Sequence, residues 1–152
     1  MSDDPQHRTP STEQSDTEDM LPWIAQADVG HLGERMGIEW LEVTPERTVA
    51  RMPVTGNTQP YGLLHGGASA VLAESVGSVA AVVGAGSDRI GVGIELSISH
   101  HRSVRDGYVT AVAIPLTRGR TLATFDIAIT NEQGERTATA RLTCLLRDAT
   151  RS

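Results

Sequence analysis

The sequence predicts a single α+β domain in which a curved antiparallel sheet of about six strands wraps around one long central helix. The segment from 63 to 87 places one carboxylate, Glu74, among small and apolar residues. Its apolar residues recur at spacings near three and four, which indicates a helix. Two strand-like segments precede this helix and four follow it. A helix that is apolar around most of its circumference needs a sheet curved around it, which favours this architecture.

The chain has 152 residues, enough for one domain with a substantial core but too few for two. Its net charge of -6, with no basic cluster interleaved with aromatic residues, argues against a nucleic-acid partner. The single cysteine, Cys144, excludes an internal disulfide and a sulfur-based zinc site. No apolar segment led by Arg or Lys opens the sequence, so we expect no signal peptide and a cytoplasmic location.

The stretch from 68 to 85 is apolar enough to raise the question of a membrane span. Glu74 and the several Ser and Gly residues within this stretch favour a buried helix instead. We therefore expect no membrane partner.

Residues 1–19 are rich in Ser, Thr, Asp, Glu and Pro and contain almost no apolar residues, which predicts a disordered tail. The domain then covers 20–152 and opens with a short helix over 20–32. The central helix can open at Gly66-Gly67 and close within 84–87. The predicted strands cover 36–43, 48–54, 91–101, 108–116, 121–130 and 136–146, with turns at 44–47, 105–107 and 131–134.

Two residues of the central helix suggest hydrolytic chemistry. Glu74 and Ser78 are four residues apart and therefore share one helical face. A carboxylate held there can act as a general base toward water or attack an acyl carbon directly, and both routes remain open. Ser78 can hold the water in position.

The start of the same helix suggests an oxyanion site. The first N–H groups, around Gly66, lack intrahelical partners and carry the positive end of the helix dipole. Glycine permits close approach of a carbonyl oxygen, and Gln59 can supply a second donor.

The spacing of these two groups has a quaternary consequence. Gly66 and Glu74 are roughly 12 Å apart along one helix, because each residue adds about 1.5 Å of rise. One acyl carbon cannot lie about 3 Å from both groups. If both serve one site, Glu74 must come from a second, antiparallel helix, which predicts a homodimer with shared active sites.

The run Gln59-Pro-Tyr-Gly-Leu-Leu-His-Gly-Gly-Ala-Ser69, with Glu74 five residues further on, resembles the signature of hotdog-fold acyl-CoA thioesterases. Within that superfamily the chain is similar to the branch of 4-hydroxybenzoyl-CoA thioesterase and the phenylacetate-pathway thioesterases. It most resembles 1,4-dihydroxy-2-naphthoyl-CoA hydrolase and the enterobactin proofreading thioesterase, through 63–69, 72–78 and the strand 91–96 leading to His100-His-Arg102. The resemblance covers roughly 32–146.

The resemblance implies roles for five residues. Glu74 corresponds to the catalytic carboxylate of the family and Gly66 to its oxyanion N–H. Gln59 and His65 would bind and polarise the thioester, and Ser78 would orient the water.

The resemblance also implies substrate contacts outside this group. His100 would lie near the acyl pocket, and Arg102 would contact the CoA phosphates and pantetheine arm together with Arg118, Arg120 and Thr121. It further implies a homotetramer, built as a dimer of dimers, and no cofactor.

We therefore expect an acyl-CoA thioesterase that hydrolyses an aromatic acyl-CoA, such as 1,4-dihydroxy-2-naphthoyl-CoA or a hydroxybenzoyl-CoA, to the free acid and CoA. A medium-chain acyl-CoA thioesterase is one alternative, and a hotdog acyl-thioester hydratase or dehydratase is another. A non-catalytic acyl-CoA sensor is a third, although such a protein would typically lack the acidic residue. No metal is expected, since His100 and His101 are adjacent in a strand and point to opposite faces.

Overall fold

The computed structural model describes residues 29–149 of the chain. The tail predicted over 1–19 lies outside this range, as does most of the short helix predicted over 20–32.

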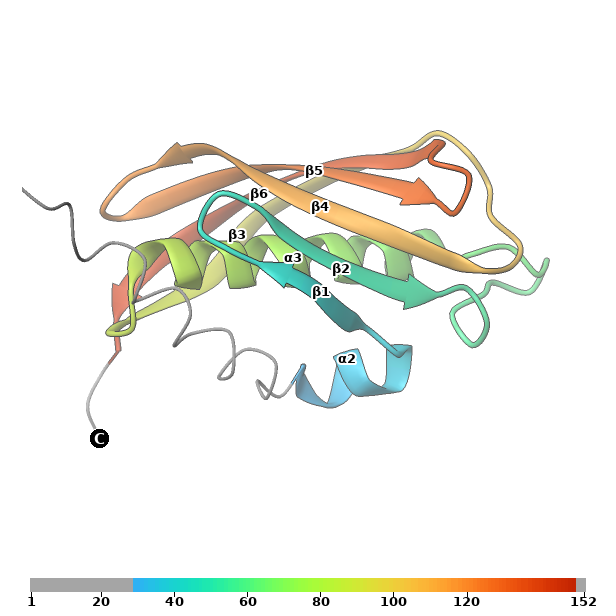
Figure 1. Cartoon of the computed structure of the whole chain (residues 1–152), viewed down its shortest axis with the longest axis horizontal. Helices are drawn as coiled ribbons and strands as arrows, with labels where there is room; N and C mark the ends of the chain where they lie inside the picture. Colours follow the sequence, from blue (N-terminus) through green and yellow to red (C-terminus); the bar gives the residue numbers. More distant parts are fainter. Residues whose placement is uncertain (1–28, 150–152) are drawn as a thin grey trace, which may run out of the picture.

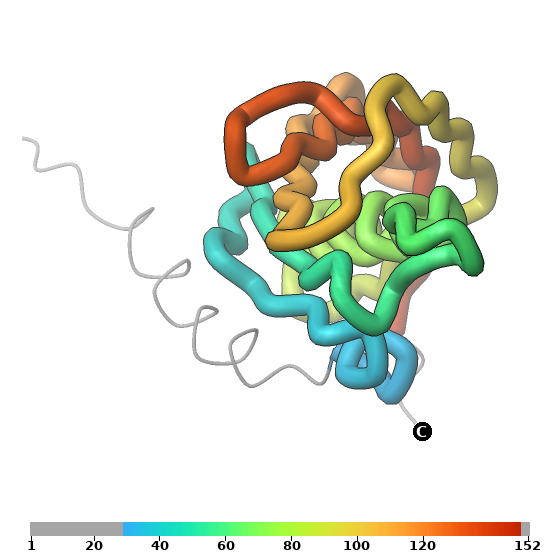
Figure 2. The backbone as a smooth tube through the Cα atoms, turned by 90° about the vertical axis from the view of Figure 1, so that its right-hand side faces the viewer, coloured from blue at the N-terminus to red at the C-terminus, as the bar shows by residue number. Residues whose placement is uncertain are grey.

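One antiparallel sheet of six strands curves around a single long helix, α3 (Gly66–Ala85), which lies across its concave face (Figure 1). The strands are β1 (Glu39–Val43), β2 (Thr48–Pro53), β3 (Arg89–His100), β4 (Tyr108–Arg118), β5 (Leu122–Asn131) and β6 (Arg136–Asp148). They follow the order β1-β2-β4-β5-β6-β3. The view along the long axis shows the sheet bent around α3 (Figure 2). The predicted fold class is confirmed.

The core forms where α3 meets the middle of the sheet. Leu72 and Val76 of α3 are fully buried, as are Phe125 and Ile127 of β5. Gly77 permits the closest approach, because a Cβ atom built there would lie 2.5 Å from Leu142 Cδ2 of β6. The backbone of the helix therefore packs directly against the Leu142 and Ile127 side chains of the sheet, with no helix side chain between them at this point.

By length and composition, α3 is apolar enough to cross a membrane. Half of its most apolar window is buried inside the domain. The core helix of a folded protein has the same composition, so this apolarity is accounted for by the sheet around it.

A shorter helix, α2 (Gly30–Met36), precedes the sheet, and the strand predicted over 36–43 begins too early. Gly37 has a φ of 70°, a left-handed conformation that ends α2, and β1 starts only at Glu39. The Asn57 side chain then donates hydrogen bonds of 2.8 Å to the Met36 and Pro53 carbonyls. This amide ties the end of α2 to the end of β2.

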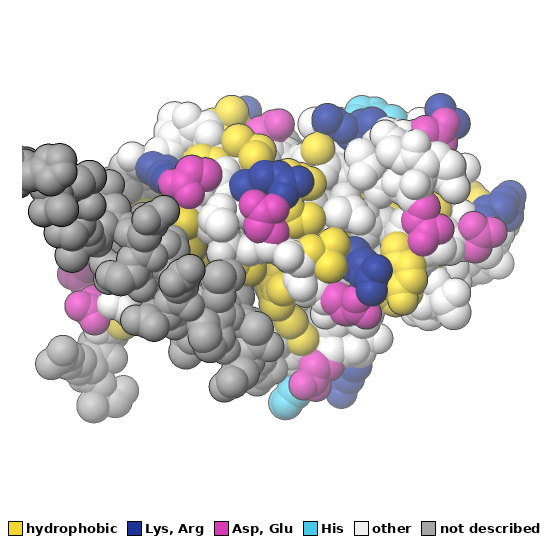
Figure 3. Space-filling view, viewed as in Figure 1, with side chains coloured by type: hydrophobic (Ala, Val, Ile, Leu, Met, Phe, Trp, Pro, Cys, Tyr) yellow, Lys and Arg dark blue, Asp and Glu magenta, His cyan; other side chains and the backbone are white. Residues whose placement is uncertain are grey.

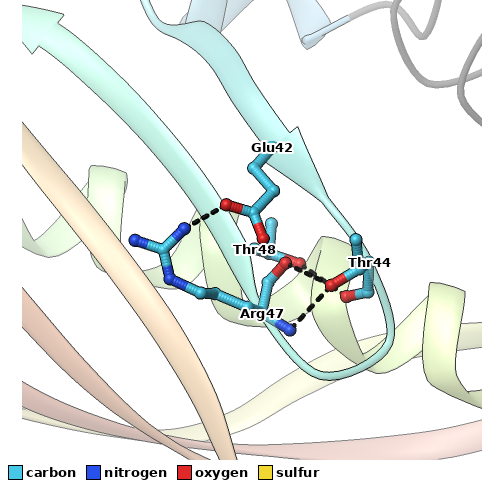
Figure 4. Close-up of polar contacts among 4 residues, drawn as sticks. All are labelled: Glu42, Thr44, Arg47 and Thr48. Carbon is cyan, nitrogen blue, oxygen red and sulfur yellow. Dashed lines mark hydrogen bonds and ion pairs between the residues drawn. The ribbon is translucent and has the colours of Figure 1, made fainter.

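The turn between β1 and β2 falls at the predicted position and is held by side chains (Figure 4). Thr44 Oγ1 donates to the Arg47 carbonyl at 2.9 Å and accepts from the Arg47 N–H at 3.0 Å. Arg47 also pairs with Glu42, and the Thr48 hydroxyl donates to the Thr44 carbonyl. The short loop is thereby fixed at one end of the sheet.

The other end of the strand order leaves an open edge. β3 pairs with β6 along its whole length, and within residues 29–149 no strand pairs with its other side. Three apolar side chains along it, Ile90, Val92 and Ile94, are about half exposed. A long apolar edge of this kind is a template for pairing with another strand.

Candidate active site

The start of α3 presents one free backbone donor. His65 is the N-cap residue, and its Nδ1 accepts a hydrogen bond of 2.8 Å from the Gly67 N–H. The Ala68 and Ser69 N–H groups donate to the His65 carbonyl. Among the described residues, the Gly66 N–H has no partner. Gly66 therefore carries an unsatisfied donor at the positive end of the helix dipole.

A cleft of about 390 Å³ opens beside this donor. It brings together four of the residues singled out in the sequence: Gln59, Gly66, His100 and Arg102. The His100 ring lies against Gly66, since a Cβ atom built on that glycine would be 2.9 Å from His100 Nε2. In this position of the imidazole, a side chain at residue 66 would require the His100 ring to move.

Glu74 and Ser78 lie in a different cleft of about 360 Å³, between α2 and α3. Its other walls are small or apolar and are formed by Val29, Leu32, Gly33, Val71 and Ser75. Glu74 is exposed and makes no hydrogen bond or ion pair with any residue in 29–149. Its Oε1 lies 3.0 Å from the position that a Cβ atom would take on Gly93 of β3. The carboxylate therefore rests against the edge strand and remains free to react.

Cys144 lies buried in the sheet below Glu74 and Ser78 and does not compete as a nucleophile. Burial raises the pKa of the Cys144 thiol, and the charge of Glu74 raises it further, against an opposing hydrogen bond with Ser78. A thiol whose pKa is raised stays protonated near neutral pH and is a weak nucleophile. Of the two groups, Glu74 is the exposed one.

A third cleft of about 280 Å³ lies at the far end of α3 and has a basic rim. Arg118 and Arg120 line it together with Arg89, over an apolar floor that includes Phe125. Arg89 donates a hydrogen bond of 2.7 Å to the Arg120 carbonyl. Thr121 follows directly along the chain, and its carbonyl accepts from the Leu146 N–H at 2.7 Å.

The structure thus separates the predicted residues into three clefts along one helix. Gln59, Gly66, His100 and Arg102 lie at its start, Glu74 and Ser78 at its middle, and Arg118 and Arg120 at its end. His65 caps the helix next to the first cleft. Within one chain, the Gly66 N–H and the Glu74 carboxylate do not line the same cleft.

The sequence did not indicate Arg89 or Leu32 as site residues. Arg89 joins the basic rim only because β3 and the β4–β5 turn come together at the end of α3. Leu32 faces the Glu74 cleft through the packing of α2, which no motif marks. Nor did the sequence indicate Tyr61 as a site residue, although it lies inside the motif that begins at Gln59 and is one of two tyrosines in the chain.

Residues 61–138 match the Thioesterase superfamily. The chain is 47% identical to the proofreading thioesterase EntH of Cronobacter turicensis, over 80% of this chain and 90% of that protein. The thioesterase HI1161 of Haemophilus influenzae has a similar structure, with a TM-score of 0.78 at 31% identity, covering 88% and 92% of the two chains. A mutant of thioesterase PA1618 of Pseudomonas aeruginosa gives a TM-score of 0.75 at 36% identity, covering 93% and 96%.

The sheet wrapped around one helix and the agreement with these structures define a hotdog-fold thioester hydrolase. The chain belongs to the Thioesterase superfamily, and its relatives include proofreading thioesterases. The expectation of an enzyme that cleaves acyl-CoA-like thioesters is thereby confirmed for the class of reaction.

Proposed function

We propose that this enzyme hydrolyses an aromatic acyl-CoA to the free acid and CoA, with Glu74 as its catalytic carboxylate. One observation carries the proposal. Glu74 is an unpaired carboxylate on α3, and the same helix begins with an unpaired N–H at Gly66. These are the two groups that cleavage of a thioester needs, one to activate the attack and one to hold the oxyanion.

In the proposed reaction, the thioester carbonyl oxygen accepts a hydrogen bond from the Gly66 N–H, with Gln59 as second donor. Glu74 removes a proton from a water held by Ser78, and the resulting hydroxide adds to the carbonyl carbon. The tetrahedral intermediate then collapses and breaks the carbon–sulfur bond, and the proton on Glu74 passes to the departing sulfur, so that CoA and the acid are released. In the alternative route, Glu74 attacks the carbonyl carbon itself, and water hydrolyses the mixed anhydride.

His65 fits a supporting role at the thioester. Its Nδ1 accepts from the Gly67 N–H, so in the neutral ring the proton resides on Nε2. That Nε2–H is free to donate to the substrate, while His100, packed against Gly66, lies beside the acyl group.

The proposed site is shared between two copies of the chain. The open edge of β3 can pair with β3 of a second copy, and a two-fold axis would place their α3 helices side by side and antiparallel. Glu74 rests against Gly93 of this edge strand, so it lies at the proposed interface. The cleft with Gly66 of one copy then faces the cleft with Glu74 of the other. A dimer of such dimers, acting in the cytoplasm without a cofactor, completes the proposal.

The CoA part of the substrate would bind through cations at the surface. Arg102 lines the cleft of Gly66 and is about half exposed, and Arg120 and Thr121 lie at the far end of α3. Guanidinium groups bind phosphate through paired donors, which suits the nucleotide.

CoA release from a panel of aromatic and medium-chain acyl-CoAs tests the substrate, and Glu74→Gln tests the mechanism. Glutamine keeps the volume but cannot accept the proton or attack carbon, so kcat should fall on the order of 10²–10⁴-fold. The fold and oligomeric state should be unchanged by circular dichroism and gel filtration. A Glu74→Gln enzyme with near wild-type kcat would disprove this role, and a preference for medium-chain substrates would exclude the aromatic assignment.

A further inference from the structure

Tyr61 is the most exposed large apolar side chain in the described part of the molecule, with 81% of its surface accessible. It lies in a tight turn closed by a hydrogen bond of 2.9 Å from the Gly62 N–H to the Gln59 carbonyl. The Gln59 N–H donates to the Leu63 carbonyl, and the Arg105 side chain reaches the Tyr61 carbonyl. The backbone is therefore held in place, and the ring contacts little of its own chain. Aromatic residues presented in this way are typical of contact sites.

In the proposed dimer, the turn that carries Tyr61 lies near the Glu74 cleft of the second copy. Gln59, two residues before Tyr61, lines the same cleft as Gly66. In the shared site proposed above, that cleft faces the partner's Glu74. Two residues span at most about 7 Å, so the Tyr61 backbone lies within that distance of the cleft that we propose to face the partner's Glu74.

The cleft around Glu74 is missing a wall that an aromatic ring could supply. Val29, Leu32 and Val71 form one apolar side of it, and Leu32 remains 56% exposed. Leu32 and Tyr61 are thus two exposed apolar side chains on opposite halves of one proposed site. Bringing them together would remove both from water.

We propose that Tyr61 of one copy closes the acyl pocket of the other, against Leu32 and Val71. The pocket takes a flat aromatic acyl group between the Tyr61 ring and the α2–α3 wall. Tyr61 is therefore a specificity-determining residue acting in trans. This inference rests on the proposed shared site.

The test compares Tyr61→Ala with the matched control Tyr61→Phe, which keeps the ring. The readout is the ratio of kcat/KM for benzoyl-CoA to kcat/KM for decanoyl-CoA. Loss of the ring should lower this ratio by at least about tenfold, within the range that apolar pocket contacts provide. The Phe variant should keep the wild-type ratio. Inhibition by free CoA should be unchanged in both variants, because the ring contacts only the acyl group. An unchanged ratio in Tyr61→Ala overturns the inference.

Hybrids with Glu74→Ala distinguish action in trans from action within one chain. Tyr61→Ala carrying one affinity tag is coexpressed with a large excess of Glu74→Ala carrying another, and double-tagged hybrids are isolated. If Tyr61 acts in trans, one of the two sites of the hybrid dimer combines the intact Glu74 of one chain with the intact Tyr61 of the other, and the second site lacks Glu74 and is inactive. The hybrid should then show the wild-type ratio. If the ratio remains that of Tyr61→Ala alone, the assignment in trans is overturned.

The controls separate this inference from the proposed function. Full activity of Glu74→Ala alone, or no CoA release by the wild-type enzyme, refutes the proposed mechanism itself. An inactive Glu74→Ala enzyme together with an unchanged ratio in Tyr61→Ala refutes only the role of Tyr61.

Discussion

At the scale of single residues, charge pairing at the mouth of the Gly66 cleft bears on CoA binding. Arg102 Nη2 lies 3.4 Å from Glu135 Oε1, and both side chains are about half exposed. An exposed pair of this kind contributes little to stability, so the guanidinium can exchange its carboxylate for a phosphate. If Arg102 binds the CoA phosphate as proposed, Glu135 competes with that phosphate for the same cation.

Substitutions of the two partners should therefore act in opposite directions. Arg102→Ala should raise KM for acyl-CoA several-fold with little change in kcat, whereas Glu135→Gln should leave KM unchanged or lower it. Neither change should affect hydrolysis of the corresponding acyl-pantetheine, which lacks the nucleotide. Steady-state kinetics at two salt concentrations measure this, because an exposed ionic contact weakens with screening. Equal losses on both substrates would assign Arg102 to the fold or the acyl pocket instead.

At the scale of the element, α3 both packs against the sheet in the core and carries the proposed catalytic residues. Its buried face holds Gly77 against the sheet, while its open side carries Glu74 and Ser78. The glycine is unfavourable for an isolated helix by about 1 kcal/mol relative to alanine. Its retention is explained by the contact with Leu142, which leaves no space for a methyl group.

We predict that Gly77→Ala destabilises the protein despite the better helix propensity of alanine. Overpacking a core costs about 1–3 kcal/mol, which outweighs the gain from propensity. The free energy of unfolding should fall by about 1–2 kcal/mol. Gly84→Ala is the matched control on the same helix, because a Cβ atom there would lie no closer than 3.5 Å to the Arg118 side chain. Denaturant unfolding at one fixed protein concentration compares the two, and a more stable Gly77→Ala protein would contradict the packing argument.

The helix and most strands could be predicted because the spacing of apolar residues that marks each element lies within a short stretch of the sequence. Residues on α3 also keep fixed relative positions, so the pairing of Glu74 with Ser78 and their separation from Gly66 follow from the sequence. The start of β1 was wrong because Met36 and Ile38 alternate like a strand, while the left-handed Gly37 ends a helix between them. The placement of β3 beside β6 could not be predicted, because this pairing joins segments far apart in the chain.

The clefts were less predictable than the residues that line them. The wall of the Glu74 cleft depends on how α2 packs beside α3, and the basic rim depends on three arginines from two chain segments. The periodicity of a sequence shows on which face of its helix or strand a residue lies. It does not show which other helix or strand packs against that face.

At the scale of the whole molecule, charges of both signs are interspersed with hydrophobic side chains on the face shown in Figure 3. Among the exposed charges of the described residues, Arg51 pairs with Glu39 and Arg47 pairs with Glu42. The face in Figure 3 shows no extended basic surface. The apolar edge of β3 is the surface on which the proposed dimer depends.

Complementation between two inactive variants tests the shared site directly. Gly66→Pro removes the N–H donor while keeping a backbone conformation suited to the first turn of a helix. Gly66→Ala is its control, since it introduces a Cβ atom against His100 but keeps the donor. Mixed with Glu74→Ala, the Pro variant should regain part of the wild-type rate of CoA release, because one hybrid site has both groups intact. Exchange of subunits without any recovery would refute a site built from two chains.

The length of α3 between Gly66 and Glu74 also sets how two substrates lie relative to each other. In a two-fold dimer with shared sites, the two reacting carbonyl groups are related by the axis and separated along the helices by roughly 12 Å. Two CoA molecules carry several negative charges each, and at that spacing they would repel if they left on the same side. Arg102 and Arg120, which we propose to bind the CoA, would offset part of this charge at each site. Both sites can then be filled at once, so turnover at one need not wait for release at the other.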